Sequence, residues 1–179
     1  MLELASLSEN SVQARIEKIG KKTKVKDWVR VDASDADTIP EFPKLTLQDL
    51  RNLTFGLYQL KQAKSYTQEH IKEDGSYEMF VGREFQDLIC VKLRSRHVTS
   101  KVYYIWIEYA AGGSTAEAIT GWYCTCPNGA RLVGCCAHIA AGMWYLSYAR
   151  HDDSLDLIYH WPTNILDASQ MDDIESDQE

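Results

Sequence analysis

The residues best suited to chemistry in this chain are three cysteines and one histidine that lie close together. They form two pairs, Cys124-x-Cys126 and Cys136-x-His138, with nine residues between the pairs. Three thiolates and one imidazole make up a tetrahedral ligand set that structural zinc sites use. The spacing therefore predicts one structural zinc ion, bound by Cys124, Cys126, Cys136 and His138.

The local structure expected around these residues brings the two pairs together. Side chains alternate along a strand, so Cys124 and Cys126 project from the same face if this segment is extended. Cys136 and His138 begin an apolar helix, where the backbone amides and the helix dipole stabilise a thiolate. The residues between the pairs include turn formers that allow the chain to reverse direction: Pro127, Asn128, Gly129 and Gly134.

Other interpretations of the cysteines stay open at this point. Four of the five fall between positions 124 and 136, and such a concentration of paired thiols favours metal ligands over ordinary buried thiols. A disulfide framework is disfavoured, because the number of thiols is odd and the N-terminal stretch does not read as a secretory segment. Cys135 is the remaining thiol of the cluster. Cys136 has the better spacing to His138, but an exchange of roles between Cys135 and Cys136 remains open.

The pattern C-x-C-x9-C-x-H before an apolar helix resembles the SWIM zinc finger, a short ββα module. A longer region, 43–150, resembles the C-terminal region of animal DDE-type transposases and transposase-derived proteins. The segments that carry this resemblance are LTxxDLRxLTFGLYQLKQAKSYTxEH, LRSRHVTSKxYYIWIEY and GWYCTCxxGARLVGCCAHIAAxxWYLSYARH. The catalytic RNase H-like domain of those transposases is not in this chain. The resemblance therefore implies a zinc-binding accessory module with DNA as a natural ligand, and implies nothing about strand cleavage or joining.

The charge of the chain is unevenly distributed. The net charge of −7 over 179 residues argues against a nucleic-acid partner, but residues 167–179 alone hold six acids and no base. The rest of the chain has 19 basic and 20 acidic residues, which leaves a net charge of −1. Residues 15–30 hold seven bases against two acids. Blocks of this kind are typical of solvated surface or of a flexible binding arm.

Hydropathy and cysteine usage predict an intracellular protein, most plausibly a nuclear one, with no membrane partner. The longest apolar run is far shorter than the roughly 18 residues that cross a bilayer. The first twenty residues lack the apolar core of a signal peptide. Thiols grouped as metal ligands fit a reducing compartment.

The first part of the chain is expected to contain two helices separated by a linker. Residues 8–20 have apolar positions at helical spacing, and residues 21–43 form a basic and then acidic linker, in which Trp28, Val29 and Val31 make one anchoring strand or docking segment. One helix is predicted from Thr46 to His70. It begins with an acidic form of the capping box and continues as a leucine stripe.

The period then changes from helical to alternating, which predicts four strands joined by short links: 77–81, 88–95, 102–110 and 118–124. The fold class is therefore α+β, an antiparallel meander with an N-terminal helix and a C-terminal helix that the SWIM-like finger anchors. The apolar helix is expected to lie across the sheet. The predicted division is 1–43 as helix and linker, 44–162 as the α+β domain with the finger at 121–150, and 163–179 as a disordered acidic tail.

Two functions of different classes follow. Arg94, Arg96 and Lys101 lie in a predicted hairpin connection, where arginines, hydroxyls and loop amides can contact the phosphates of DNA, although an ordinary solvated turn has the same composition. The alternative is a protein-interaction or dimerisation module that uses the apolar helix 139–148. Catalysis is not expected, because no nucleophile and base have a recognisable spacing and four protein ligands close a zinc site. No small-molecule substrate is expected either.

Overall fold

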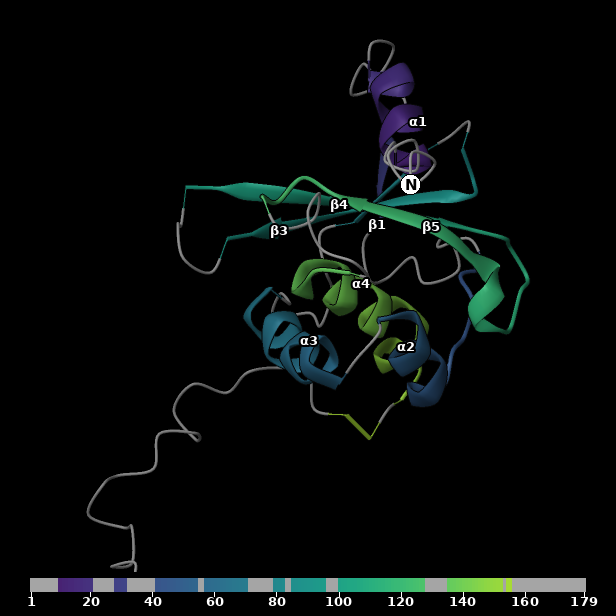
Figure 1. Ribbon diagram of the computed structural model, residues 1–179, viewed down its shortest axis with the longest axis vertical. Helices are drawn as coiled ribbons and strands as arrows, with labels where there is room; N and C mark the ends of the chain where they lie inside the picture. The colour runs from purple at the N-terminus through teal and green to yellow at the C-terminus, as the bar shows by residue number, and fades with distance from the viewer. Residues whose placement is uncertain are drawn as a thin grey trace, which may run out of the picture.

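The computed structural model shows a mixed α+β architecture, which confirms the predicted fold class. Within the described part of the chain, a five-stranded antiparallel sheet lies between helix α1 on one face and helices α2, α3 and α4 on the other (Figure 1). The residues that the structure describes are 10–20, 28–31, 41–54, 57–70, 79–82, 85–95, 100–127, 135–152 and 154–155.

The strands lie side by side in the order in which they occur along the chain, and every neighbouring pair is antiparallel. The predicted meander is therefore correct, but the number of strands is five and not four. The extra strand is the segment predicted to anchor or dock, which pairs with the residues after position 78. The strands are β1 (Trp28–Val31), β2 (Met79–Gly82), β3 (Leu88–Arg94), β4 (Val102–Tyr109) and β5 (Ile119–Cys124).

Strand β4 carries apolar side chains on both faces, and the two faces are buried to different extents. Ile105 and Ile107 are fully buried and point into the main core, toward α4. Tyr104 and Trp106 alternate with them and lie on the opposite face, where Tyr104 is 41% exposed. Burial therefore alternates along β4, with the more solvated aromatic side chains on the face away from α4.

Helix α4 (Ala137–Ser147) forms the centre of the core. Residues 138–147 are all buried, because the helix lies between the sheet and helices α2 and α3 (Figure 1). Small residues in its middle allow this close approach, and a methyl group added at Gly142 would lie 3.5 Å from Cδ1 of Ile105. The prediction that this helix lies across the sheet is confirmed. Its apolar surface is used inside the same chain: residues 139–147 are buried and Tyr148 is half-buried, so little of the 139–148 segment is left for a partner.

The single helix predicted over 46–70 is wrong, because the described chain has two helices there, α2 (Leu47–Leu53) and α3 (Leu57–His70). The start is as predicted: Thr46 and Asp49 form both bonds of a capping box. The end of α2 is set by Thr54, which is buried and donates from both its backbone N–H and its hydroxyl to the carbonyl of Leu50. A threonine hydroxyl bonded in this way satisfies the last carbonyls locally and favours a bend.

Helix α1 (Ser11–Gly20) is attached to the outer side of β4 and β5 by apolar, ionic and hydrogen-bond contacts. Val12 is 1% exposed and faces Gly121. Arg15 donates two hydrogen bonds to the carboxylate of Asp87, at 2.8 and 2.9 Å, and also pairs with Glu108. The guanidinium of Arg15 holds the pKa of Asp87 below its usual range. Arg15 therefore contributes to folding and is not part of a free basic arm.

Several predicted features lie outside the described residues. They include most of the basic segment, at 21–27, and the acidic tail, at 163–179, so both stay predictions. The side chain of His70 is not described either. Within the part of the chain that is described, no helix has the length and apolar character needed to cross a membrane.

The contact between α1 and β5 gives a test of this docking. In Gly121→Ala, the new Cβ would lie 2.6 Å from Cγ2 of Val12, so the helix or the strand has to move. We expect the free energy of unfolding, measured by urea denaturation, to fall by about 1–3 kcal/mol, as overpacking typically costs. Gly20→Ala is the matched control, since no atom lies within 4 Å of the added group. Equal effects of the two substitutions would contradict the docking.

Candidate metal centre

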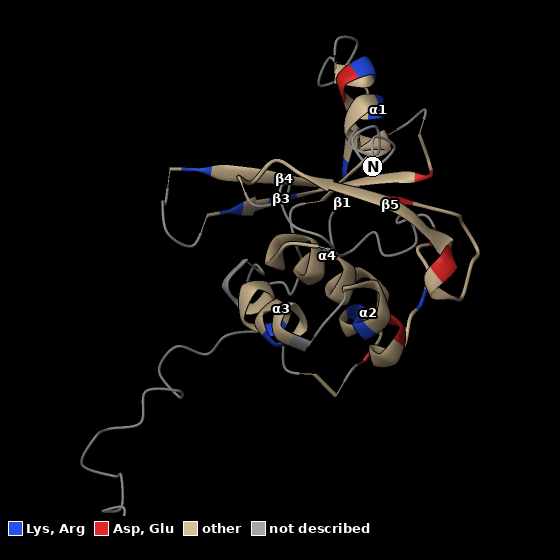
Figure 2. Ribbon diagram, viewed as in Figure 1, with Lys and Arg blue, Asp and Glu red and all other residues tan. Residues whose placement is uncertain are grey.

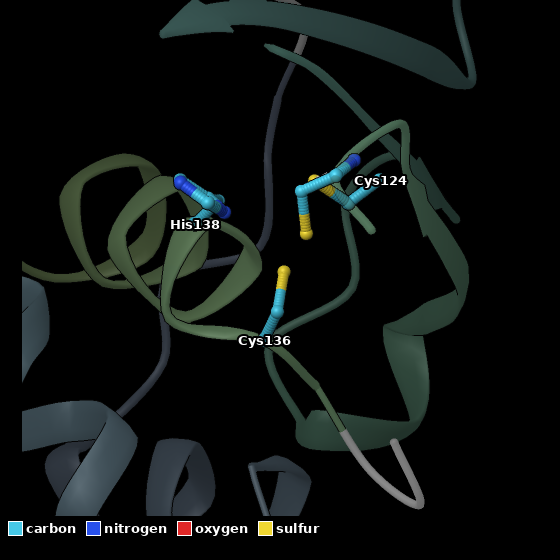
Figure 3. Close-up of side chains that lie close together, drawn as sticks. Cys124, Cys136 and His138 are labelled. Atoms are coloured by element: carbon cyan, nitrogen blue, oxygen red, sulfur yellow. Dashed lines mark hydrogen bonds between the residues drawn. The ribbon is translucent and has the colours of Figure 1, made fainter. Parts of the chain in front are cut away.

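The structure brings together the four residues that the sequence predicts as ligands. Cys124 ends strand β5, Cys126 follows two residues later, and Cys136 and His138 lie at the beginning of α4. Their ligand atoms all lie within 4.8 Å of one another. Figure 3 shows Cys136 and His138 on the helix side of this space and Cys124 on the strand side.

These dimensions fit a metal ion. A tetrahedral site with metal–sulfur bonds of about 2.3 Å has sulfur atoms about 3.8 Å apart. The separations of up to 4.8 Å are only slightly larger, so a small contraction of side chains suffices. In addition, Nδ1 of His138 is buried and has no hydrogen-bond partner among the described residues. Since an unsatisfied buried nitrogen is costly, coordination through it would remove an unfavourable feature. The four residues can therefore hold one metal ion.

The strand side of the site is positioned by continued pairing with β4. Beyond the last residue of β5, Thr125 donates its backbone N–H to the carbonyl of Tyr104 and accepts the N–H of Tyr104 at its hydroxyl oxygen. This pairing keeps the chain extended, so Cys124 and Cys126 reach the same space as predicted. The backbone N–H of Cys126 then donates to the sulfur of Cys124 at 3.4 Å, a contact that favours negative charge on that sulfur.

The helix side of the site is positioned by the start of α4. Cys136 is the N-cap residue and has the extended backbone typical of that position, with φ −78° and ψ 165°. Its side chain makes no capping hydrogen bond, and the sulfur lies with the other ligand atoms instead. The positive end of the helix dipole is then directed toward a group that must be negative to bind metal.

The electrostatics of the cluster without a cation show why a metal suits it. Hydrogen bonds from Cys124 and then from Cys136 lower the pKa of Cys126. The pKa of Cys124 is raised, first by its hydrogen bond to Cys126 and then by Cys136. The cluster therefore favours one thiolate and resists a second. A bound cation supplies the positive charge that allows all three thiols to lose their protons.

His138 is held between aromatic rings from two different elements. The ring centroids of Tyr66 in α3 and Tyr103 in β4 lie 5.1 and 5.0 Å from that of the imidazole. Burial disfavours the charged imidazole, but hydrogen bonds to Cys126 and Cys136 outweigh it and raise the pKa of His138 to about 9. Protons thus compete with a metal for this ring. The two tyrosines were not predicted, because no local pattern connects residues 66 and 103 with residue 138.

The roles of the remaining cysteines follow from their surroundings. Cys135 is buried but lies outside the group of four, and burial, with a smaller effect of Cys136, raises its pKa to about 12. The geometry therefore favours Cys136 over Cys135 as the ligand. Cys90 is buried in β3, where burial raises the pKa of its thiol. All five cysteines are free, so the disulfide interpretation is wrong.

The predicted nucleic-acid residues are brought together only in part. Arg94 ends β3 and Lys101 directly precedes β4, and both are exposed. The backbone N–H of Ser95 donates to the carbonyl of Lys101 at 2.8 Å, which holds the two strand ends side by side. Figure 2 shows basic residues at this end of β3 and β4 and acidic residues at the opposite end. Arg96 lies outside the described residues.

Comparisons of the chain with protein-family models, with curated proteins and with solved structures find no match. The resemblance to SWIM fingers and to transposase C-terminal regions therefore stays a prediction from the sequence motifs. What can be said of the site comes from its own geometry and chemistry.

The adjacent cysteines allow a sharp test of the ligand assignment. We expect the purified protein to contain one divalent metal ion per chain, as measured by elemental analysis. Cys136→Ser removes one of four ligands and should release the metal, while Cys135→Ser should retain it, because Cys135 lies outside the group. The opposite result, loss of metal in Cys135→Ser alone, would show that Cys135 is the ligand.

Proposed function

We propose that this chain is a zinc-binding, SWIM-type module without catalytic activity that binds DNA as an accessory part of a transposase-like or transposase-derived protein. The observation that carries the proposal is the convergence of three cysteines and one histidine at the junction of the sheet and α4. The proposed relation to transposases is supported by the motifs in the sequence.

The donor set favours zinc as the metal. Three thiolates and one imidazole in a tetrahedral arrangement are typical of structural zinc sites, and soft thiolates are disfavoured ligands for magnesium or calcium. With four protein donors, the ion has no open position for water or substrate. A site of this kind stabilises structure, which supports a non-catalytic role.

The ion would connect two elements that bury the core. Cys124 and Cys126 belong to the strand side, and Cys136 and His138 belong to the start of the helix in which residues 138–147 are all buried. Cys124 pairs with Ile105, and Thr125 pairs with Tyr104. The metal ligands therefore lie toward the end of β4 that is next to Arg94 and Lys101. Zinc binding would therefore stiffen the end of the sheet that we propose to contact DNA.

DNA binding is supported by the exposed bases at the end of the β3–β4 hairpin, Arg94 and Lys101, which strand pairing holds next to each other. Two basic side chains at the paired ends of neighbouring strands suit phosphate contacts, which position a protein on DNA without reading its sequence. The rival function, dimerisation through the 139–148 segment, requires a surface that the chain buries in its own core. Thiolate ligands and a DNA partner together favour a reducing compartment, the nucleus.

The effect of zinc on stability can be measured with a chelator. The sheet and α3 bury α4 without any contribution from the metal, so we expect the far-ultraviolet circular dichroism to be largely retained after chelation at 20 °C. The melting temperature should fall, because a ligand that binds only the folded state stabilises it. Added zinc should restore it. Complete loss of secondary structure on chelation would contradict a core that is independent of the metal.

DNA binding should show the salt dependence of phosphate contacts. Each contact contributes about 0.9 to the slope of log K against log salt. Changing Arg94, Arg96 and Lys101 together to Gln should therefore lower the magnitude of the slope by roughly two to three units. The binding can be followed by fluorescence anisotropy on a labelled duplex at several salt concentrations.

A second triple variant has the same change in net charge and serves as the control. Arg51, Lys61 and Lys64 are exposed on α2 and α3, beyond α4 as seen from the sheet. Their change to Gln should leave the slope nearly unaltered. If both triple variants bind like the parent, the DNA surface lies elsewhere, most plausibly in the basic segment 18–30. Absence of binding at low salt would contradict the proposed function itself.

A further inference from the structure

The face of the sheet that points away from α4, here called the outer face, carries a row of aromatic residues. Strand pairing places Arg30, Phe80, Cys90, Trp106 and Tyr123 next to one another, one from each strand. With strands about 4.8 Å apart, this row is about 19 Å long. The aromatic members are partly exposed and do not belong to the main core.

The neighbouring rows of the outer face add a second exposed ring and more positive charge. Tyr104 pairs with Lys92, and Arg94 pairs with Val102, so two bases flank Tyr104 on β3. Tyr104 is 41% exposed and lies two residues from Trp106 on the same face. The edge-to-face contact of Trp106 with Trp28, with ring centroids 5.0 Å apart, holds the Trp106 ring in one orientation. Aromatic and basic side chains are thus interleaved on a flat surface.

The one carboxylate on the described strands lies at the opposite end of this face. Among the described strand residues, the only carboxylate is that of Glu108, and it pairs with Arg15 of α1. Helix α1 covers the same end, where Val12 contacts Gly121, and the helix axis points away from the sheet rather than across it (Figure 1). In the other half of the outer face, Lys92 and Arg94 place positive charge beside Tyr104, which suits an anionic partner.

We infer that the outer face binds single-stranded nucleic acid, with unpaired bases stacked on Tyr104 and Trp106 and phosphates near Lys92 and Arg94. The inference rests on the proposed nucleic-acid binding and extends it to the form of the nucleic acid and to the surface that holds it. Aromatic rings on a basic surface bind single strands in this way, because every base has a face that can stack.

The shape of the surface favours a single strand over a duplex. In duplex DNA the faces of the bases are stacked on one another, so rings on a flat sheet cannot reach them. A sheet face is also too broad for the major groove, which is about 12 Å wide. A duplex can still meet the hairpin end through its phosphates, and the two modes differ in whether they need the ring of Tyr104.

The test compares a labelled deoxythymidine single strand with a duplex of the same length, by fluorescence anisotropy at one salt concentration. Tyr104→Ala should weaken binding of the single strand by about 5- to 150-fold, which corresponds to the loss of one stacked base. Binding of the duplex should change by less than about twofold, because phosphate contacts remain. Tyr104→Phe keeps the ring and should bind the single strand nearly as well as the parent.

Two controls separate a lost ring from a lost fold. Tyr58 is 70% exposed on α3, away from the outer face, and Tyr58→Ala should not alter binding. Circular dichroism melting shows whether Tyr104→Ala is folded at the assay temperature. If it is not, Tyr104→Leu replaces it, since leucine keeps apolar bulk in the strand without a ring that stacks.

Each outcome is decisive. Equal loss of single-strand and duplex binding in Tyr104→Ala, or no loss of either, would overturn the inference and leave the proposed DNA binding in place. Absence of binding to both forms would overturn the inference and the proposed function together. Self-association that Tyr104→Ala abolishes, without binding of the single strand, would assign the outer face to a second copy of the chain.

Discussion

The complete burial of helix α4 is the constraint on which the rest of the structure depends. A helix that is apolar on all sides is stable in water only if other elements surround it. Here the sheet covers one side and helices α2 and α3 cover the other. Gly142 lies in ordinary contact distance of Ile105 and Ile107 of the sheet, and the break at Thr54 divides the preceding helical segment into two helices. The central position of α4 also explains why the metal ligands at its first turn meet those at the end of β5.

The candidate metal centre concentrates charge where a buried core tolerates it least. Three thiols and an imidazole in contact cannot all take their metal-binding forms without a cation, and the opposite shifts in the pKa of Cys124 and Cys126 express that conflict. A single ion would resolve it and would also join a strand to a helix. The rings of Tyr66 and Tyr103 both contact the imidazole, so the orientation of His138 depends on α3 and β4 as well as on its own helix.

On the described strands, Glu108 lies at one end of the outer face, and Lys92 and Arg94 lie at the other. Arg15 neutralises Asp87 and Glu108 where α1 docks, and the bases of β3 lie around Tyr104 at the other end. The negative net charge of the chain therefore does not describe this end of the sheet, which carries basic residues. Part of the basic block near the N-terminus serves folding, since Arg15 is held by two carboxylates. Lys92 and Arg94 on the sheet lie beside Tyr104, a ring that solvent can reach.

Local sequence patterns determined the fold class, the meander, the start of the helix at Thr46, the apolar nature of α4 and the four candidate ligands. These features depend on periodicity, turn formers and short spacings, which are contained within a few neighbouring residues. The tertiary structure decided what depends on distant partners: that β1 adds a fifth strand, that Thr54 ends α2 and that Cys136 rather than Cys135 faces the cluster. It also decided which face of β4 is buried, because a strand that is apolar on both sides gives no local sign of where the helices pack. The apolar character of 139–148 predicted that this segment is buried. Whether this chain or a partner covers it depended on contacts between residues far apart in the sequence.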